Sequence, residues 1–375
     1  MKMVKLGKIV ENLDNKRIPL NDAERKAKTV KKLYPYVGAN NIVDYIDEYI
    51  FDEQILCVAE DGGSWGLCEK CANIYNGKTW VNNHAHVLRS NGKADLNFLR
   101  FFLNYSDLNK YITGTTRGKL TRSKLDNIDV PLPPIEEQIQ IATVLSKAEN
   151  LIAKRKESIE LLDEFVKSTF LEMFGDPVRN EKGWDKKTLK SFGQIITGNT
   201  PPRGDLENYS DNFIEWIKTD NIISSETYIS KASEYLSEKG LKKARTVTVG
   251  ALLVACIAGS VESIGRSAIA DRTVSFNQQI NAIQPSNEVN SLFLYWLFKI
   301  SKYYIQNQAT KGMKKILTKG IFEKIIMIKP PTKLQNQFAE IANKVEVLKA
   351  KYQKSLEELE NLYGSLSQRA FRGEL

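Results

Sequence analysis

The sequence is short of the residues on which several protein classes depend. Two histidines and four cysteines in 375 residues leave little material for acid–base catalysis and too few thiols for a disulfide framework. The longest apolar run, residues 251–258, is far below the ~20 residues that a membrane-spanning helix needs. With only 22 glycines and 11 prolines, collagen-like and low-complexity classes are excluded as well. The sequence therefore predicts a globular protein with no membrane partner, and the scarcity of cysteine favours the reducing cytoplasm.

Length and charge set the first positive expectations. Because a single hydrophobic core usually stops growing near ~250–300 residues, a chain of 375 residues predicts two or three domains. Lys and Arg total 54 against 45 acidic residues, which gives a net charge of +9. This excess is a mild indication of a polyanionic partner.

The chain is written twice, and this internal repeat determines the predicted architecture. The matching pairs are residues 133–142 with 330–339, 80–86 with 275–281, 36–42 with 216–222, Leu120 with Leu317, and Phe174 with Phe371. Each half therefore holds a module of about 130–150 residues followed by a distinctive tail of about 40.

The two tails are predicted to be long helices. After Pro134 there is no proline or glycine until the helix-ending residues 175–177, which predicts a helix over 135–174. At 1.5 Å per residue, each helix would be about 60 Å long. Both tails carry apolar residues at heptad spacing: Ile152, Ile159, Leu162, Val166 and Met173 in the first, and Leu334, Phe338, Ile341, Val345, Leu348, Tyr352, Leu356, Leu359, Leu362, Leu366 and Ala370 in the second. Since such stripes must be buried, we expect an antiparallel coiled coil; ordinary long core helices are the alternative.

The modules are predicted to be mixed α/β (α+β). Apolar runs at 54–59 and 251–257, and at 85–88 and 280–283, predict equivalent buried strands. One amphipathic helix per module is expected at 96–111 and at 291–305. The predicted fold is two mixed α/β modules separated by two long antiparallel helices, with an internal pseudo-two-fold repeat.

Several short segments accompany this repeat. They are residues 130–138 (VPLPPIEEQ), 174–177 (FGDP), Trp184 with Leu189, 197–201 (TGNTP), 220–222 (DNI), 276–279 (FNQQ) and 371–375 (FRGEL). In these segments, and in its order of module, helix, module, helix, nearly the whole chain resembles the specificity subunit of type I restriction-modification systems. It departs from the pattern in two places: the second Pro-Pro copy keeps only Gln335 of the Glu-Glu-Gln run, and the first module lacks a clear counterpart of 197–201.

The resemblance implies two target-recognition domains at 1–134 and 176–331 and two conserved long helices at 135–175 and 332–375. It implies a non-catalytic DNA-binding chain that recognises an asymmetric bipartite target and directs two modification subunits and the restriction subunits to it. Two half-sites read from one side of the duplex would lie about one turn, ~34–36 Å, apart. The chain itself would bind no cofactor and no metal, while its partner subunits would use S-adenosylmethionine, ATP and Mg²⁺.

Basic residues recur at one place in both halves and are the candidates for phosphate contacts. They are Arg117, Lys119, Arg122 and Lys124 in the first half, and Lys311, Lys314, Lys315 and Lys319 in the second. Candidates for base contacts are polar residues of the matched segments and their surroundings: Asn40, Asn41, Arg203, Lys218, Asp220 and Asn221. The alternatives are a solvated charged surface for the basic runs and a turn-forming role for Asn41 and Asn221. For Asn82, Asn277 and Gln278, sheet-edge hydrogen bonding and DNA contact both stay open.

Other readings carry less weight. Residues 114–120 have one residue too few for a phosphate-binding loop, and Leu120 stands where Ser or Thr would hold Mg²⁺. Cys68, Cys71, His84 and His86 suggest a zinc site, but their spacing differs from that of the usual finger. Two other functions remain: the specificity chain of a type II-like fused nuclease-methylase, and a coiled-coil adaptor that binds proteins.

Overall fold

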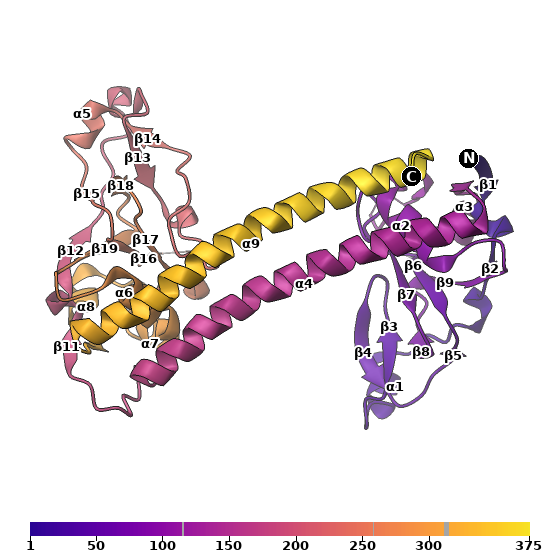
Figure 1. Cartoon of the computed structure of the whole chain (residues 1–375), viewed down its shortest axis with the longest axis horizontal. Helices are drawn as coiled ribbons and strands as arrows, with labels where there is room; N and C mark the ends of the chain where they lie inside the picture. The colour runs from indigo at the N-terminus through magenta and orange to yellow at the C-terminus, as the bar shows by residue number, and fades with distance from the viewer. Residues whose placement is uncertain (115, 258, 311–314) are drawn as a thin grey trace. The chain divides into compact units, whose positions relative to one another are not determined.

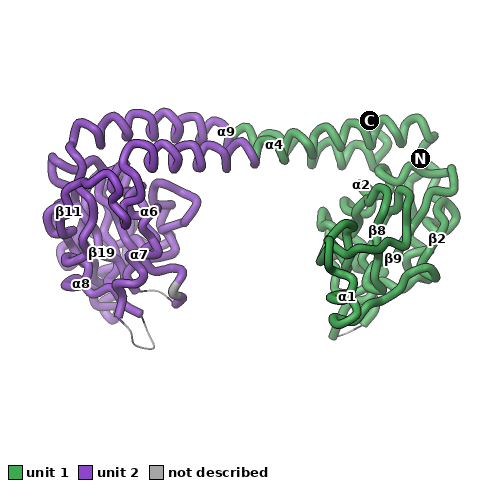
Figure 2. Tube along the Cα trace, turned by 90° about the horizontal axis from the view of Figure 1, so that it is seen from below, with its two compact units in different colours: residues 1–156, 354–375 green, residues 157–353 purple. Residues whose placement is uncertain are grey.

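The computed structural model describes residues 1–375 except 115, 258 and 311–314 (Figure 1). The chain forms two compact units, coloured separately in Figure 2. Unit 1 consists of residues 1–156 and 354–375, and unit 2 of residues 157–353. Helices α4 (Ile135–Phe174) and α9 (Thr332–Arg372) each contribute one part to both units. The predicted division at 134, 175 and 331 follows the linear sequence and stays a prediction.

Unit 1 contains two four-stranded sheets, one two-stranded sheet and short helices. Its elements before α4 are β1 (Lys2–Lys5), β2 (Val10–Asn12), α1 (Asp22–Ala27), β3 (Tyr34–Val37), β4 (Ile42–Ile46), β5 (Phe51–Asp52), β6 (Ile55–Ala59), β7 (Ala72–Tyr75), β8 (Lys78–Val81), β9 (Ala85–Ser90), α2 (Leu96–Tyr105), α3 (Arg122–Asp126) and β10 (Asp129–Leu132). One sheet has the order β2-β9-β6-β7 and is antiparallel. The other has the order β4-β3-β8-β5, with β3 and β8 parallel.

Unit 2 repeats this arrangement. Its elements are β11 (Lys186–Thr188), β12 (Gly193–Thr197), β13 (Ile214–Ile217), β14 (Tyr235–Leu236), α5 (Glu238–Leu241), β15 (Thr246–Val247), β16 (Leu252–Ala255), β17 (Ser267–Ile269), β18 (Val274–Phe276), β19 (Ile280–Pro285), α6 (Ser291–Ile300), α7 (Lys302–Asn307), α8 (Lys319–Lys324) and β20 (Ile326–Ile328). The sheets have the orders β12-β19-β16-β17 and β14-β13-β18-β15, and β13 and β18 are parallel. Strand for strand, this is the order of unit 1, so the mixed α/β fold and the internal repeat are confirmed.

The buried strands lie where the apolar runs predicted them, whereas the two module helices end earlier than predicted. Every residue of β6 and of β16 is buried, which fits a strand covered on both faces. The helix expected over 96–111 ends at Tyr105, and a separate 3-10 turn follows at Asn109–Tyr111. The helix expected over 291–305 is interrupted at Ser301, between α6 and α7. In both modules the apolar spacing continued past the end of the helical hydrogen bonding.

One glutamine in each half connects the start of the long helix to its module. The side chain of Gln138 accepts a hydrogen bond from the backbone N–H of Asp95, at 2.9 Å, and donates one to the carbonyl of Pro133. Gln335 does the same with Asn290, at 3.0 Å, and with Pro330. Both glutamines are buried, and unpaired buried amides are costly. The residue retained from the Glu-Glu-Gln run is therefore the one that positions α2 and α6.

Within each unit, α4 and α9 pack in opposite directions. In unit 1, Ile141 and Leu145 near the start of α4 share a core with Ala370 near the end of α9. In unit 2, Phe170 near the end of α4 contacts Phe338 near the start of α9, with ring centroids 5.3 Å apart. The predicted antiparallel pairing of the long helices is therefore confirmed in each unit.

The predicted apolar stripe of α9 is wrong at two positions. Leu348 and Leu362 are exposed, the latter by 51%, whereas Lys349 and Tyr363 face inward. A helix with 3.6 residues per turn drifts away from a strict seven-residue repeat. In addition, the modules themselves contact the helices, so the buried positions follow two surfaces instead of one.

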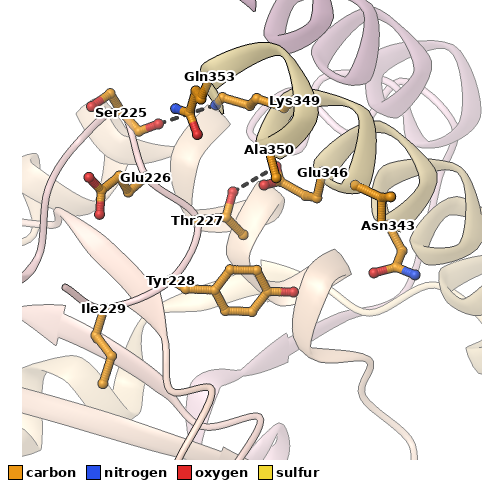
Figure 3. Close-up of a pocket in the computed structure, with 11 residues that line it drawn as sticks. Ser225, Glu226, Thr227, Tyr228, Ile229, Asn343, Glu346, Lys349, Ala350 and Gln353 are labelled. Atoms are coloured by element: carbon orange, nitrogen blue, oxygen red, sulfur yellow. Dashed lines mark hydrogen bonds between the residues drawn. The ribbon is translucent and has the colours of Figure 1, made fainter. Parts of the chain in front are cut away.

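Lys349 shows how a cation occupies such a position. Its ammonium lies 2.8 Å from a carboxylate oxygen of Asp163 on α4 and donates to the carbonyl of Ser225, at 3.2 Å. Beside it, the hydroxyl of Thr227 donates to Glu346, at 2.8 Å. These contacts surround a cavity of about 380 Å³ between α9 and the loop before β14 (Figure 3). Polar contacts thus attach α9 to the second module where apolar packing was expected.

Along the described residues, we find no helix that combines the length and the apolar character required to cross a membrane.

Candidate nucleic-acid interface

The two basic segments are attached to their modules in the same way. In the first, the backbone N–H of Leu120 donates to the backbone carbonyl of Glu60, directly after β6. The carbonyl of Leu120 lies 2.7 Å from Nε2 of His86 on β9. In the second, the backbone N–H of Leu317 donates to the backbone carbonyl of Cys256. The carbonyl of Leu317 accepts from the side-chain amide of Asn281 on β19, at 3.1 Å. Both leucines are buried. These hydrogen bonds attach the backbone at Leu120 and at Leu317 to the central sheet of each module.

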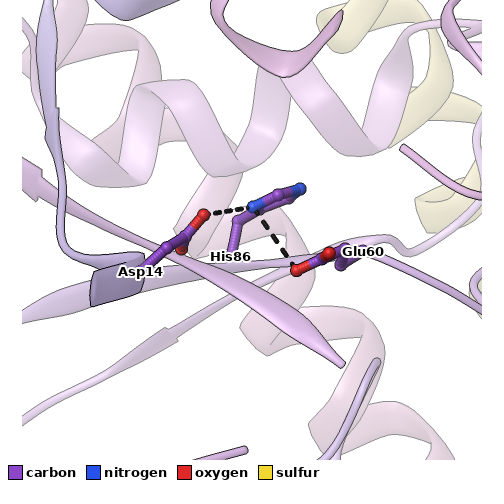
Figure 4. A group of neighbouring side chains, drawn as sticks. All are labelled: Asp14, Glu60 and His86. Carbon is purple, nitrogen blue, oxygen red and sulfur yellow. Dashed lines mark hydrogen bonds and ion pairs between the residues drawn. The ribbon is translucent and has the colours of Figure 1, made fainter. Parts of the chain in front are cut away.

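A buried cluster of charges supports the first basic segment (Figure 4). Nδ1 of His86 lies 2.6 Å from Asp14 and 3.8 Å from Glu60. Glu60 also binds Arg17, at 2.6 Å, and Lys119, at 3.0 Å. Lys119 is thus one of the cations that balance these carboxylates.

The cluster also explains the titration of Asp14. Burial alone would raise the pKa of the Asp14 carboxyl, but the hydrogen bond and charge of His86 and the backbone N–H of Val87 hold that pKa below its ordinary value of 3.8. Unit 2 has the neutral counterpart, in which the hydroxyl of Thr197 donates to Asn281, at 2.6 Å. The same position on the sheet is ionic in one module and neutral in the other.

A second cluster lies at the end of β13. The guanidinium of Arg203 sits over the rings of Trp216 and Tyr209, with its central carbon 4.7 and 4.6 Å from the centroids. Arg203 also binds Glu234, at 2.8 Å, and the ammonium of Lys218 pairs with the same carboxylate. The hydrogen bond from Lys218 is the largest effect that lowers the pKa of Glu234, and Arg203 adds to it.

The first module has a similar cluster at the end of β3. Arg25 lies over the ring of Tyr36, at 5.7 Å, and 3.4 Å from a carboxylate oxygen of Asp44 on β4. Arg25 and Tyr36 line a polar cavity of about 350 Å³, to which Arg117 and His84 also contribute. The cavity thus brings Arg117 of the basic segment together with Arg25 and Tyr36.

The family model of the type I restriction modification DNA specificity domain matches residues 1–161 and again residues 181–361. The chain belongs to this family. A Haemophilus influenzae protein assigned as a type I restriction enzyme specificity subunit is 28% identical over 357 residues, which cover 92% of this chain and 87% of that protein. The MjaVIII specificity subunit of Methanocaldococcus jannaschii is 23% identical over 332 residues, covering 80% and 75%.

Solved structures agree on the fold. The S subunit of a type I restriction-modification system from M. genitalium superposes with a TM-score of 0.67 at 15% identity, covering 99% of this chain and 96% of that one. A chain from a structure on complex assembly of the type I R-M system gives a TM-score of 0.55 at 16% identity, covering 100% and 98%. The expected membership of the type I specificity-subunit family is confirmed.

In this family member, the described candidates for phosphate contact are exposed cations, apart from Lys315. Arg117 is 64% exposed and binds Asp61, at 2.7 Å, beside Gly62, whose positive φ of 63° suits glycine. Arg122 pairs with Asp126 at 3.8 Å, and Lys319 with Glu323 at 3.7 Å. Lys124 is exposed and Lys315 half-buried, and Lys311 and Lys314 lie outside the described residues. Because exposed ion pairs contribute only ~0–1 kcal/mol, the paired cations can exchange their partners for phosphates at small cost.

The amide candidates divide into two groups. Asn221 has a folding role, since its side chain accepts from the backbone of Lys218 and donates to Ser230 and Lys231. The backbone N–H of Gly38 donates to the carbonyl of Asn41, and this hydrogen bond closes the β3–β4 turn. Asn40 has a buried side-chain oxygen with no hydrogen-bond partner among the described residues, and Asp220 is exposed. These two have groups to offer a ligand, and any base contact by them stays a prediction.

The strand amides are mostly structural. The side-chain oxygens of Asn82 and Asn277 accept from the backbone two residues later, at 2.8 and 3.1 Å, and both residues are buried. For Asn82 and Asn277, these are the structural hydrogen bonds expected as the alternative to DNA contact, and they occur at equivalent places in both modules. Gln278 is exposed and accepts a hydrogen bond from the hydroxyl of Thr200, so it lies next to the loop that follows β12.

The suggested zinc ligands have other partners. Cys71 is buried against the carbonyl of Leu103, and burial raises the pKa of its thiol to about 12. His84 pairs with Asp61 and His86 with Asp14, whereas Cys68 is exposed. Within the described part of the chain, the one group of three ligand atoms that lie close enough for a metal is Asp14, Glu60 and His86. Arg17 and Lys119 already neutralise that group, so ion pairing accounts for it.

Sequence reasoning missed Arg25, Tyr36 and Asp44, because no pattern connects a surface helix with a hairpin. The missing counterpart of 197–201 is also found in the structure. The indole of Trp216 donates to the carbonyl of Asn199, at 3.2 Å, and the indole of Trp80 donates to that of Ile18, at 2.8 Å. The loop around Ile18 follows β2, and the TGNTP segment ends β12 and continues after it; β2 and β12 pair with the equivalent strands β9 and β19. The loop around Ile18 therefore occupies the place of the TGNTP segment.

Asp14→Asn tests the buried cluster. Replacement puts an amide N–H where His86 needs an acceptor, and we expect a loss of about 2 kcal/mol in the free energy of unfolding at pH 7. Because the pKa of Asp14 is lowered on folding, its contribution is present above pH 3.8 and disappears as the pH falls through the folded-state pKa. Urea unfolding of both proteins at several pH values measures this. The exposed Asp52→Asn is the control, and a deficit that is the same at every pH would contradict the assignment.

Proposed function

We propose that the chain is the DNA sequence-specificity subunit of a type I restriction-modification complex and that it reads an asymmetric bipartite target. The observation that carries the proposal is the equivalent attachment of the two basic segments, through Leu120 in one module and Leu317 in the other, to equivalent sheets of the two modules. With cations at an equivalent place in the sequence of each module, both modules would contact the DNA phosphates in the same manner. The family membership supports this reading.

The asymmetry follows from differences between the modules. Where the second module has Trp216 and Lys218, the first has Tyr36 and Gly38. The carboxylate beside the aromatic residue is Glu234, next to β14, in one module and Asp44, on β4, in the other. Side chains of different length and charge at equivalent places present different hydrogen-bonding groups to DNA. Two unlike half-sites are therefore proposed, with a gap that the helices set.

Partner subunits are proposed to dock on the helices. Large apolar side chains are exposed on α4, among them Ile139 and Leu151 in unit 1 and Leu161 and Phe165 in unit 2. Exposed apolar residues of this size on helices are typical of protein interfaces. We propose that modification subunits bind there and carry out methylation with S-adenosylmethionine, while restriction subunits use ATP and Mg²⁺. The chain would act in the cytoplasm as a recognition subunit without catalysis of its own.

Mapping methylated bases in cells tests the function. Genomic DNA is sequenced from cells that express the modification subunit with this chain, without it, and with residues 1–134 replaced by those of another specificity subunit. We expect one bipartite motif with a fixed gap that disappears without the chain, and a change of one half-site only in the hybrid. Methylation that is unchanged without the chain would instead favour a protein-binding adaptor.

A further inference from the structure

We infer that Arg25 and Arg203 are equivalent guanine-reading arginines, one for each half of the target. This inference rests on the proposed function and adds the residue and the base that it reads in each module. Arg25 lies in the connection between β2 and β3, and Arg203 lies in the equivalent connection between β12 and β13. Neither belongs to the basic segments around Leu120 and Leu317.

The repeat places the surroundings of the two arginines at matching positions. Tyr36 pairs with Trp80 in the parallel β3–β8 ladder, and Trp216 pairs with Ser275 in the parallel β13–β18 ladder. Since residues 80 and 275 are equivalent in the repeat, Tyr36 and Trp216 are equivalent as well. Each is buried and lies beneath an arginine.

The carboxylates are equivalent by the same reasoning. Asp44 is the cross-strand partner of Tyr36 on β4. Glu234 is opposite Trp216 beside β14, where its carbonyl accepts from the Trp216 N–H, at 3.0 Å. In an antiparallel pair, side chains directly opposite one another are within contact distance. Each module thus combines an arginine, the aromatic ring beneath it and a carboxylate across the strand.

This combination fixes a guanidinium without using up its donors. An aromatic face and a carboxylate restrict the plane of the group, so less side-chain entropy is lost when it binds a base. Arg203 is 53% exposed and uses Nη2 for Glu234; Nε and Nη1 have no hydrogen-bond partner among the described residues. Arg25 uses Nη2 for the exposed Asp22, and its buried Nε faces Asp44, at 3.4 Å; its Nη1 has no hydrogen-bond partner within the same residues.

Arg272 shows what a purely structural arginine looks like in the same module. Its Nε donates to Glu215, at 2.9 Å, its Nη1 to Asp271, at 2.5 Å, and its Nη2 to Glu215 and to the carbonyl of Ser230. All three nitrogens are engaged. In Arg25 and Arg203, Nη1 has no hydrogen-bond partner among the described residues and Nη2 has one, so an N–H remains on each of these two neighbouring nitrogens. Two such donors match the O6 and N7 acceptors of guanine, which is the commonest specific contact of arginine with DNA.

In the first module, the cavity is large enough to admit a base edge. It measures about 350 Å³, opens to solvent and is lined by Arg25, Tyr36, Asn82, Asn83 and Arg117. Arg117 comes from the basic segment, so a phosphate contact and a base contact would be neighbours. A guanine edge presented to Arg25 therefore has the sugar-phosphate backbone within reach of Arg117.

The test is the selection of DNA sequences by the full chain in complex with its modification subunit. A randomised duplex pool is bound and sequenced for the natural protein, Arg25→Lys and Arg203→Lys. Lysine keeps the positive charge and loses the bidentate fork. We expect one required guanine in each half-site. The requirement should be lost from the first half only in Arg25→Lys and from the second half only in Arg203→Lys, with a tenfold or larger drop in preference and an unchanged salt dependence.

Matched controls separate this from a structural effect. Arg89→Lys in the first module and Arg272→Lys in the second replace ion-paired arginines outside the two clusters, and we expect both to select the natural sequence. Thermal unfolding of all four variants confirms that they are folded. Selection of a bipartite sequence that Arg25→Lys and Arg203→Lys leave unchanged would overturn the inference and leave the proposed function intact. Failure of the natural complex to select any sequence would overturn the proposed function itself.

Discussion

Ending the chain after Gln353 is expected to unfold the first module, although the deleted residues come from the opposite end of the sequence. Residues 354–375 belong to unit 1. Ala370 is fully buried in the core of that unit, with Leu366, Tyr363 and Phe371 packed around it. Phe371 contacts Phe102 and Tyr105, at 5.5 and 5.3 Å between ring centroids. The last turns of α9 therefore complete the core that α2 and the start of α4 leave open.

The expected effect is large compared with the stability of a domain. Removing one buried phenylalanine side chain costs about 3–5 kcal/mol, and whole domains are stable by only about 5–15 kcal/mol. The truncation removes four apolar side chains from this core, those of Tyr363, Leu366, Ala370 and Phe371. Hydrogen exchange is the suitable measurement, since it reports each module separately. We expect the amides of β6 and β9 to lose protection, and those of β16 and β19 to keep it.

A shorter truncation is the control. Ending the chain after Arg372 removes the residues beyond α9 and leaves the packing of Phe371 in place. Protection should then match the full chain in both modules. If β6 and β9 stayed protected after the deletion of residues 354–375, the first module would have a self-sufficient core, and the assignment of the C-terminal segment to unit 1 would be wrong.

The long helices and the repeat could be predicted because local signals decide them. Pro134 and Gly175, with its φ of 73°, bracket α4, and the helix spans the residues between them as predicted. The buried strands β6 and β16 followed from uninterrupted apolar runs in the same way. For these elements, each residue's preference agrees with its tertiary surroundings.

Side-chain partners across elements could not be predicted, because spacing carries no information about them. Lys349 is buried since Asp163 on another helix and a carbonyl of a loop receive its charge. Arg25 became a candidate for base contact only when β3 and β4 placed Tyr36 and Asp44 beside it. Residues 197–201 and the loop around Ile18 have no shared sequence, and the pairing of β2 with β9 and of β12 with β19 shows their equivalence. Charged and aromatic contacts of this kind depend on register, which one sequence does not reveal.

Neutralising three cations of the first basic segment is expected to weaken DNA binding by about a thousandfold, because each charge-assisted phosphate contact contributes at least ~1.5 kcal/mol. The variant replaces Arg117, Arg122 and Lys124 by glutamine. Lys119 is left in place because it balances Glu60 in the buried cluster. Each lost phosphate contact also removes about 0.9 from the slope of log affinity against log salt, so the slope should fall by about 2.7. Titration of the target duplex at four salt concentrations measures both quantities.

The control removes the same charge elsewhere. Lys344, Lys351 and Lys354 are exposed on α9, and their replacement by glutamine changes the net charge by the same three units. If these helix cations contact no phosphate, the salt slope should keep its natural value, with a small decrease in affinity from the weaker long-range attraction. An equal fall in slope for both triple variants would mean that net charge, and not the basic segment, drives binding. A fall confined to the first variant places DNA against the surface that His86 and Leu120 hold to the central sheet of the first module.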